Sequence, residues 1–133
     1  MAASATILHV EDDGSLQNLV RIALEQIGGY AVLTAGTGGE ALALAASAPP
    51  QLLLLDLDLP DMSGLATLRA LRALPGLAAV PAVFLTAACR PELEVELRAA
   101  GAEEVLRKPF RPRLLVQAVV RILARRERGA APA

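Results

Sequence analysis

The sequence predicts an α/β domain built on a doubly wound, five-stranded parallel sheet flanked by five helices. Short apolar runs of strand length alternate along the chain with longer segments of helical periodicity, the order that builds a parallel sheet with helices on both faces. The run Leu52-Leu53-Leu54-Leu55 is apolar at every position, which is typical of a strand buried on both faces. Polar residues follow several of these runs, where open α/β sheets bind their ligands.

The first two β/α units can be followed in order. The apolar run at 7–10 predicts the first strand, and apolar side chains then recur three and four positions apart over 16–27, as on one face of a helix. The glycine pair Gly28-Gly29 ends that helix. Residues 30–34 predict the second strand. The segment Thr37-Gly38-Gly39-Glu40 has capping-box spacing and begins an Ala- and Leu-rich second helix, which ends before a pair of prolines.

The remaining three units follow the same alternation. The run at 51–56 predicts the third strand. Leucines three positions apart within 64–74 predict the third helix, and Pro75-Gly76 terminates it. The last two strands are expected at 82–86 and 104–106, and the last two helices at about 92–100 and 112–126.

Length and composition indicate a single domain. The chain has 133 residues, of which 54% are hydrophobic, enough for one core but not for two. We expect a short N-terminal tail at 1–5, the domain at 6–127, and a flexible C-terminal tail at 128–133.

Charge and hydropathy narrow the expected environment. The formal net charge of -1 gives no general attraction to polyanions, so we expect no direct binding to nucleic acid. The N-terminus lacks the basic start of a signal peptide, and no apolar run approaches the roughly 18 residues of a membrane span. A single cysteine, Cys89, excludes internal disulfides. These features predict a cytoplasmic protein without membrane association.

Polar side chains that end or follow four of the strands are expected to meet at one edge of the sheet. They are Glu11, Asp12, Asp56, Thr86 and Lys108. Two carboxylates about 4 Å apart repel by roughly 4 kcal/mol at an effective dielectric near 20, so the acidic cluster needs a cation. Oxygen ligands with room for water suit Mg²⁺. A carboxylate beside Mg²⁺, a lysine and a hydroxyl can attack phosphorus and become an acyl phosphate.

Five short segments of the chain occur in a distinctive order. They are Ile7-Leu8-His9-Val10-Glu11-Asp12-Asp13, Leu54-Leu55-Asp56 with Leu59-Pro60-Asp61-Met62-Ser63-Gly64, Phe84-Leu85-Thr86-Ala87, Gly101-Ala102-Glu103-Glu104, and Lys108-Pro109-Phe110. Each is weak alone, but together they resemble the receiver domains of two-component response regulators, and in particular stand-alone chemotaxis-type regulators. The resemblance covers about residues 5–127 and implies a flavodoxin-like (βα)5 fold.

The resemblance assigns roles to the acidic residues. It implies that Asp56 accepts a phosphoryl group and that Asp12 and Asp56 bind Mg²⁺ directly. The backbone carbonyl of Asp58 would join them, and Glu11 would act mostly through water. Asp13, the third acid of the first group, is expected to cap the first helix instead.

The resemblance also implies partners. Lys108 would contact the phosphoryl group, Thr86 would move towards it after transfer, and the Lys108-Pro109 bond is expected to be cis. The donor would be a phosphohistidine on a histidine kinase or a histidine phosphotransfer protein. Output would pass to a downstream protein through the fourth helix, fifth strand and fifth helix, although Val105 stands where receivers commonly carry Tyr or Phe. Such a module catalyses its own phosphorylation and slow dephosphorylation, and is not a conventional multiple-turnover enzyme.

Other functions stay open at this point. The segment Asp56-Leu57-Asp58 is similar to the nucleophile motif of haloacid-dehalogenase-like phosphatases, but Pro60 stands where that motif favours Thr or Val, and no acidic pair follows Lys108. A receiver-fold module that works without phosphorylation should have lost one of the five polar residues, and none is lost. His9, the only histidine, lies inside a strand pattern and is expected to be structural. The sequence does not distinguish a stand-alone regulator from part of a larger one.

Overall fold

The computed structural model describes residues 5–88 and 90–130 and contains one parallel sheet with the strand order β2-β1-β3-β4-β5. The strands are β1 (Thr6–Val10), β2 (Ala31–Ala35), β3 (Leu52–Asp56), β4 (Ala82–Thr86) and β5 (Ala102–Arg107). The helices are α1 (Gly14–Ile22), its π-helical continuation η1 (Ala23–Ile27), α2 (Gly38–Ser47), α3 (Gly64–Arg72), α4 (Pro91–Ala99) and α5 (Pro112–Ala130). The predicted fold class is confirmed.

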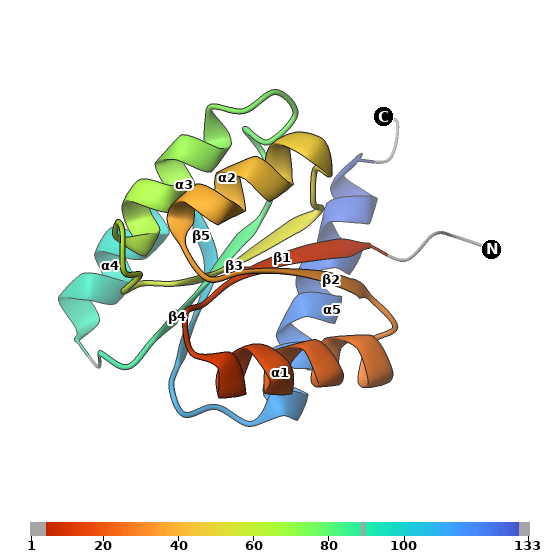
Figure 1. Cartoon of the computed structure of the whole chain (residues 1–133). Coiled ribbons are helices and arrows are strands. Elements are labelled where there is room, and N and C mark those ends of the chain that lie inside the picture. The colour runs from red at the N-terminus through yellow and green to blue at the C-terminus, as the bar shows by residue number, and fades with distance from the viewer. Residues whose placement is uncertain (1–4, 89, 131–133) are drawn as a thin grey trace.

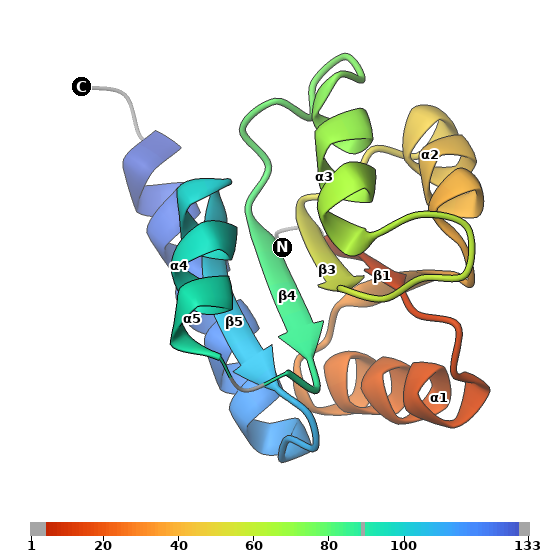
Figure 2. The same cartoon turned by 90° about the vertical axis from the view of Figure 1, so that its left-hand side faces the viewer.

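Helices cover both faces of the sheet. Figure 1 shows α1 and α5 on one side and α2 and α3 on the other, and Figure 2 shows α4 beside β5. Alternate residues of β1 point into separate cores, because successive side chains of a strand face opposite ways. Leu8 and Val10 pack on the side of α2 and α3, whereas Ile7 packs on the side of α1 and α5. Every residue of β3 is buried, as its run of leucines predicted.

Several elements differ from the sequence expectation at their ends, among them the first helix, β5 and α5. The first helix finishes as η1, where the N–H of Gly28 donates to the carbonyl of Ala23 five residues earlier. β5 begins at Ala102, and its pairing with β4 contains a register shift that accommodates one extra residue. α5 continues to Ala130, past the expected end near 126. Residues 1–4 and 131–133 of the expected tails lie outside the described residues.

The helix starts follow the capping residues of the sequence. Asp13 caps α1, and its side chain accepts hydrogen bonds from two N–H groups of the first turn. Thr37 caps α2 by accepting the N–H of Glu40 at 3.0 Å. The carboxylate of Glu40 reaches the N–H of Gly36 instead of that of Thr37. The reciprocal half of the capping box is therefore displaced by one residue.

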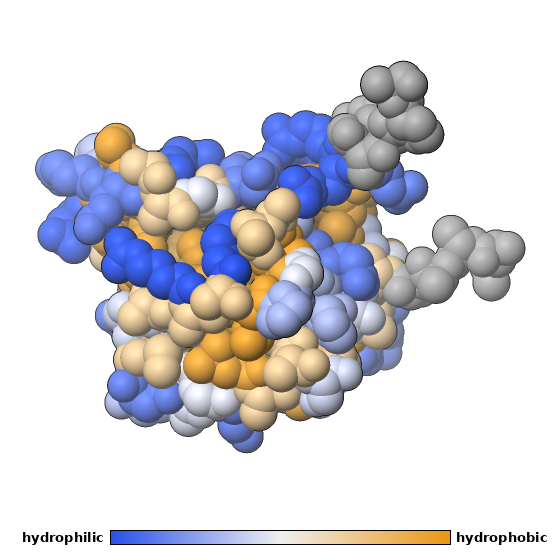
Figure 3. All heavy atoms as spheres, turned by 90° about the horizontal axis from the view of Figure 1, so that it is seen from above, coloured by the Kyte–Doolittle hydropathy of each residue, from blue (hydrophilic) through white to orange (hydrophobic). Residues whose placement is uncertain are grey.

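The face over α2 and α3 mixes hydrophobic and hydrophilic residues (Figure 3). Partly buried leucines extend the core towards this surface, among them Leu42, Leu44 and Leu65. Within the described ranges, no helix has the length and hydrophobicity needed to cross a membrane.

Candidate functional site

The carboxyl ends of the strands lie at the same edge of the sheet (Figure 2). Backbone hydrogen bonds continue the strand pairing beyond the strands themselves. The N–H of Glu11 donates to the carbonyl of Ala35 at 2.9 Å, and the N–H of Lys108 donates to the carbonyl of Thr86 at 2.8 Å. The sheet therefore fixes the backbone of these polar residues, and their side chains start from well-defined positions.

Three carboxylates gather at this edge. Glu11, Asp12 and Asp56 each offer an oxygen, and these oxygens lie within 4.8 Å of one another. Glu11 and Asp56 are buried, with 1% and 6% of their surface exposed, whereas Asp12 is exposed. Asp13 caps α1, so the acid pair of the cluster is Glu11-Asp12, as expected. The cluster is enclosed on the protein side and open to solvent at Asp12.

Lys108 balances part of the negative charge. Its Nζ atom lies 2.8 Å from Oε1 of Glu11 and 3.3 Å from Oδ1 of Asp56. Burial alone would lower the pKa of Lys108, but the hydrogen bond and charge of Glu11, together with Asp56, outweigh burial and raise that pKa. The lysine is therefore a firmly protonated cation held between two buried carboxylates. Its contact with Glu11 was not anticipated from the sequence.

Glu11 carries the clearest electrostatic strain. Burial raises the pKa of Glu11, the hydrogen bond from Lys108 opposes that rise, and the charge of Asp56 adds to it. One carboxylate oxygen binds Lys108, and the other accepts the N–H of Asp13 at 3.3 Å. The pKa stays raised although an ammonium lies 2.8 Å away. Burial is the largest cause of that rise. The three carboxyl groups of the cluster also outnumber the single ammonium that pairs with two of them, so a second cation would stabilise their ionised forms.

The donor set of the cluster suits Mg²⁺. All three side chains offer carboxylate oxygens, which are the hard ligands that Mg²⁺ prefers, and the exposed Asp12 leaves a side where the ion can keep its waters. Neither imidazole nor thiolate contributes to the cluster among the residues described, so its chemistry does not favour zinc or copper. The residues present fit the ion that the sequence predicted.

Thr86 is the last residue of β4, and Asp58 lies on the loop that follows Asp56. Thr86 is buried at the end of β4, and its hydroxyl oxygen accepts the N–H of Ala88 at 3.0 Å. Asp58 is exposed, and its N–H donates to Oδ1 of Asp56 at 3.3 Å. The structure therefore brings Lys108 against Asp56, whereas the hydroxyl of Thr86 is hydrogen-bonded within its own loop. The metal-binding role of the Asp58 carbonyl stays a prediction.

A contact that the sequence did not reveal anchors the loop after Asp56. The carboxylate of Asp61 accepts the N–H groups of Gly38 and Gly39 at 2.9 and 3.0 Å, at the positive end of the α2 dipole. These hydrogen bonds lower the pKa of Asp61. Met62 packs next to them, and a Cβ atom at Gly38 would lie 2.6 Å from its side chain. The loop that follows Asp56 is thus attached to the start of α2.

His9 lies apart from this chemistry. Its side chain is fully buried in β1, and neither ring nitrogen has a hydrogen-bond partner among the residues that the structure describes. Burial lowers the pKa of His9 to about 3, and the positive charge of Lys108 contributes to the shift. The ring is therefore neutral at physiological pH and closed to solvent. The expectation of a structural histidine is confirmed.

Most of the chain is similar in sequence to known proteins. The family model for the response regulator receiver domain matches residues 7–120. The transcriptional regulatory protein KdpE of Mycobacterium tuberculosis is 39% identical over 104 residues, which cover 78% of this chain and 44% of that protein. The DNA-binding response regulator MtrA of Mycolicibacterium smegmatis is 40% identical over 121 residues, covering 91% and 51%. The chain spans about half the length of these curated relatives.

Solved structures show the same architecture. A CheY-like response regulator receiver domain protein from Methanospirillum hungatei has a TM-score of 0.87 and 30% identity, with 96% of this chain and 100% of that chain covered. The chemotaxis protein CheY4 of Vibrio cholerae has a TM-score of 0.83 and 36% identity, with 90% and 98% covered. The resemblance first seen in five short segments thus extends to the whole fold, and the chain belongs to the receiver domain family of response regulators.

Proposed function

We propose that the chain is a phosphorylation-dependent switch in which Asp56 accepts a phosphoryl group from a phosphohistidine on a histidine kinase or a histidine phosphotransfer protein. One observation carries this proposal. Asp56 is a carboxylate at the open edge of the sheet that lies 3.3 Å from the ammonium of Lys108 and within 4.8 Å of two further acids. A nucleophile, a fixed cation and a set of metal-type ligands therefore converge on one point.

The proposed reaction exchanges one bond to phosphorus for another. An oxygen of Asp56 attacks the phosphorus, and the bond between phosphorus and the imidazole nitrogen of the donor breaks. The nitrogen keeps the bonding electrons and takes up a proton, so neutral imidazole leaves and Asp56 becomes an acyl phosphate. Lys108 stabilises the negative charge of the phosphoryl oxygens. Its hydrogen bond to Glu11 holds the ammonium near Asp56 before the donor arrives.

Glu11, Asp12 and Asp56 are proposed to hold Mg²⁺, with the backbone carbonyl of Asp58 as a further ligand. The ion, when bound, offsets the charge of the carboxylates and of the incoming phosphoryl group. The two directly binding acids would be Asp12 and Asp56, because Glu11 already gives one oxygen to Lys108 and the other to a backbone N–H. Glu11 would therefore act mainly through water and through the lysine.

Output is proposed to pass from Thr86 to a protein surface made by α4, β5 and α5. The hydroxyl oxygen of Thr86 accepts the N–H of Ala88, and a phosphoryl group on Asp56 would offer the O–H of Thr86 a charged acceptor. Movement of the hydroxyl towards that acceptor would break its bond to Ala88 and reshape the loop that leads into α4. Protein contact, and not direct contact with nucleic acid, is the readout proposed for this chain, in the cytoplasm. DNA binding is named for relatives about twice its length.

The test of phosphorylation is the intact mass after incubation with acetyl phosphate and Mg²⁺. We expect one phosphoryl adduct on the parent protein and none on Asp56→Asn. Asp12→Asn or chelation of the metal should remove most of the adduct. Asp13→Asn is the matched control, because it removes a neighbouring charge but keeps a good helix cap. An adduct that persists on Asp56→Asn would overturn the assignment.

Turnover separates this proposal from its rivals. A haloacid-dehalogenase-like phosphatase would use Asp56 and Asp58 and hydrolyse small phosphate esters repeatedly, whereas a receiver forms one adduct per chain. Asp58 is exposed and does not belong to the carboxylate cluster, which supports the receiver. A module that works without phosphorylation would give no adduct under any of these conditions.

A further inference from the structure

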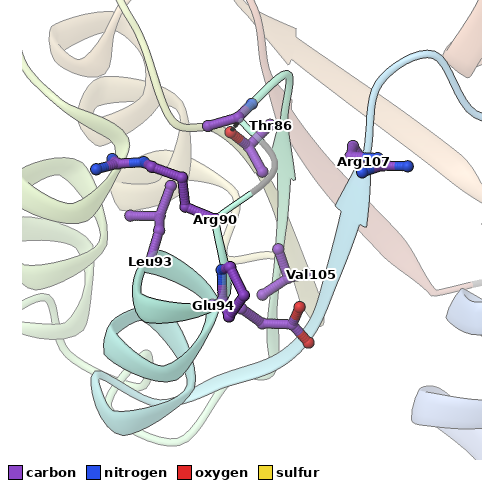
Figure 4. Close-up of a pocket in the computed structure, with 8 residues that line it drawn as sticks. Thr86, Arg90, Leu93, Glu94, Val105 and Arg107 are labelled. Carbon is purple, nitrogen blue, oxygen red and sulfur yellow. Dashed lines mark hydrogen bonds between the residues drawn. The ribbon is translucent and has the colours of Figure 1, made fainter.

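A pocket of about 260 Å³ lies between α4 and β5, next to the end of β4. Figure 4 shows that side chains from all three elements border it. Its labelled lining residues are Thr86, Arg90, Leu93, Glu94, Val105 and Arg107. The pocket is therefore bordered by apolar groups, by charged groups and by the threonine next to the phosphorylation site.

We propose that this pocket binds one aromatic side chain of a partner protein, presented next to an acidic residue. The proposal specifies the chemistry of the partner that binds the output surface described under the proposed function. Binding of the ring does not depend on phosphorylation of Asp56. Only the expected effect of phosphorylation on this binding rests on the proposed function.

The size of the pocket favours a single side chain. Pockets for drug-sized ligands and cofactors have about 300–1,000 Å³, whereas an apolar cavity of about 150 Å³ already holds benzene. The volume of about 260 Å³ lies between these values, so one ring and its connecting carbon fit. Aromatic side chains that fill such pockets are typical anchors of protein interfaces.

Val105 leaves this space open. It pairs with Phe84 across β4 and β5 and packs against the same core. Its branched side chain ends at the border of the pocket (Figure 4). A larger residue at this position would fill the pocket from within. The short side chain therefore creates room for a ring that another molecule supplies.

A second copy of the chain has no suitable ring to insert. The aromatic residues of the whole sequence are one tyrosine and two phenylalanines, Tyr30, Phe84 and Phe110. Phe84 is fully buried, and the other two are partly covered and pack against the core on the side of α1 and α5. A ring inserted into the pocket would therefore come from a different protein.

A charged residue at the pocket favours an acidic residue next to the aromatic residue of the partner. Arg90 is exposed and forms no ion pair with the side chains that the structure describes. Glu94, which also borders the pocket, is already bound to Arg98 at 3.1 Å. A carboxylate beside the inserted ring would pair with Arg90, which adds specificity at the edge of the contact.

Thr86 links the pocket to the phosphorylation site. Thr86 and Ala88 both line the pocket, and the hydrogen bond between them shapes its wall. Movement of the Thr86 hydroxyl towards a phosphoryl group would break that bond and change the pocket. By linkage, a ligand that prefers one form of the pocket also favours the matching state of Asp56.

The binding test uses three dipeptides and the backbone amide NMR shifts of the chain. N-acetyl-Asp-Phe-amide should give saturable shifts at Ala88, Leu93, Glu94 and Val105, in the parent protein and in Asp56→Ala alike. N-acetyl-Asn-Phe-amide should bind about two- to fivefold more weakly, as expected for the loss of one exposed ion pair. N-acetyl-Asp-Ala-amide should give no saturable shift.

Three variants complete the test. Val105→Phe should fill the pocket and abolish binding, whereas Val95→Phe, on the solvent-exposed side of α4, should not. Arg90→Ala, at an exposed position, should remove the preference for the Asp peptide over the Asn peptide. This variant still tests the proposal if Val105→Phe disturbs the fold. Binding that survives in folded Val105→Phe, or equal binding of all three peptides, overturns the proposal. So do shifts at the pocket that depend on protein concentration without peptide, because they indicate a second copy.

Acetyl phosphate with Mg²⁺ separates this inference from the proposed function. We expect phosphorylation to change the affinity for the Asp-Phe peptide at least twofold. Peptide binding by a chain that never forms the adduct would refute the function and leave the pocket standing. Formation of the adduct without any peptide binding would refute the pocket alone.

Discussion

Lys108 lies closer to Glu11 than to Asp56, with Nζ 2.8 Å from Oε1 of Glu11 and 3.3 Å from Oδ1 of Asp56. The ammonium therefore competes with any metal ion for the same negative charge. A doubly charged ion about 6 Å from an ammonium is repelled by ~1.4 kcal/mol even at the dielectric of water. We expect Lys108→Met to bind Mg²⁺ about tenfold more tightly and yet to be phosphorylated more slowly.

Isothermal titration calorimetry measures the affinity for Mg²⁺, and intact mass over time measures phosphorylation. Arg111→Met removes an exposed cation three residues further along the chain and should change neither quantity appreciably. Weaker Mg²⁺ binding by Lys108→Met would show that the lysine supports the metal ligands instead of competing with the ion.

Gly64 lies where the loop after Asp56 closes. Its N–H donates to the carbonyl of Leu57 at 2.7 Å, and a Cβ atom there would collide with the carbonyl oxygen of Asp56. We expect Gly64→Ala to lower the free energy of unfolding by about 1–3 kcal/mol and to slow phosphorylation, because the collision displaces the backbone of the phosphoacceptor. Urea unfolding checks the first effect. Gly14→Ala, where a Cβ meets nothing within 4 Å, is the control, and similar losses in both variants would contradict the argument.

The buried His9 should make the free energy of unfolding depend on pH in the acidic range. The unfolded chain takes up a proton on His9 below about pH 6.5, whereas the folded pKa is lowered to about 3. The free energy of unfolding should therefore fall as pH drops through this window, by at most about 1.4 kcal/mol per pH unit from this residue. His9→Leu should remove this dependence. It should also be more stable than the parent near neutral pH, because it removes two buried nitrogens that have no hydrogen-bond partner in the described part of the chain.

Urea unfolding of both proteins at about pH 7 and at about pH 5 measures the difference. The gap between His9→Leu and the parent should widen at the lower pH. A constant gap would mean that His9 has an ordinary pKa in the folded chain.

Asp61 should control the order of the loop that it anchors. Asp61→Ala removes both acceptors at the start of α2, so we expect faster hydrogen exchange at the amides of Gly38 and Gly39 and slower phosphorylation of Asp56. Asp61→Asn, which keeps one acceptor, should be intermediate. Because the pKa of Asp61 is lowered on folding, the stabilisation is present above its ordinary value of 3.8 and is lost as pH falls through the folded value. If Gly38 and Gly39 exchange at the same rates in Asp61→Ala and in the parent, Asp61 does not anchor the loop.

The sequence predicted those parts of the fold and site that depend on short local patterns. The leucines of 52–55 indicated a buried strand, and the end of that strand placed Asp56 at the edge of the sheet. The point at which the first apolar run stops separated the acid pair from the helix cap Asp13. Each of these conclusions needs only a few consecutive residues, because strand burial and capping act over that range.

The missed contacts join residues that are far apart in the chain. Asp61 and Gly38 are 23 positions apart, and Arg121 binds Glu104 across 17 positions at 3.5 Å. Periodicity records which face of an element is apolar, but it does not record which polar side chain meets a helix end or a strand from elsewhere. The bond between Lys108 and Glu11, 97 positions apart, was missed for the same reason. The resemblance placed both residues in one site but did not pair them.

β5 lies at an edge of the sheet, so the part of the site that carries Lys108 can open separately from the part that carries the three carboxylates. Among the strands of residues 5–88 and 90–130, β5 pairs with β4 alone, whereas β1 and β3 each have a strand on both sides. Native proteins open locally in units that differ in stability, and units with fewer buried contacts open first. Opening of β5 with α5 would carry Lys108 away and leave Glu11, Asp12 and Asp56 together. In such an opening the three carboxylates would stay together, whereas the lysine would leave the site until the edge of the sheet closed again.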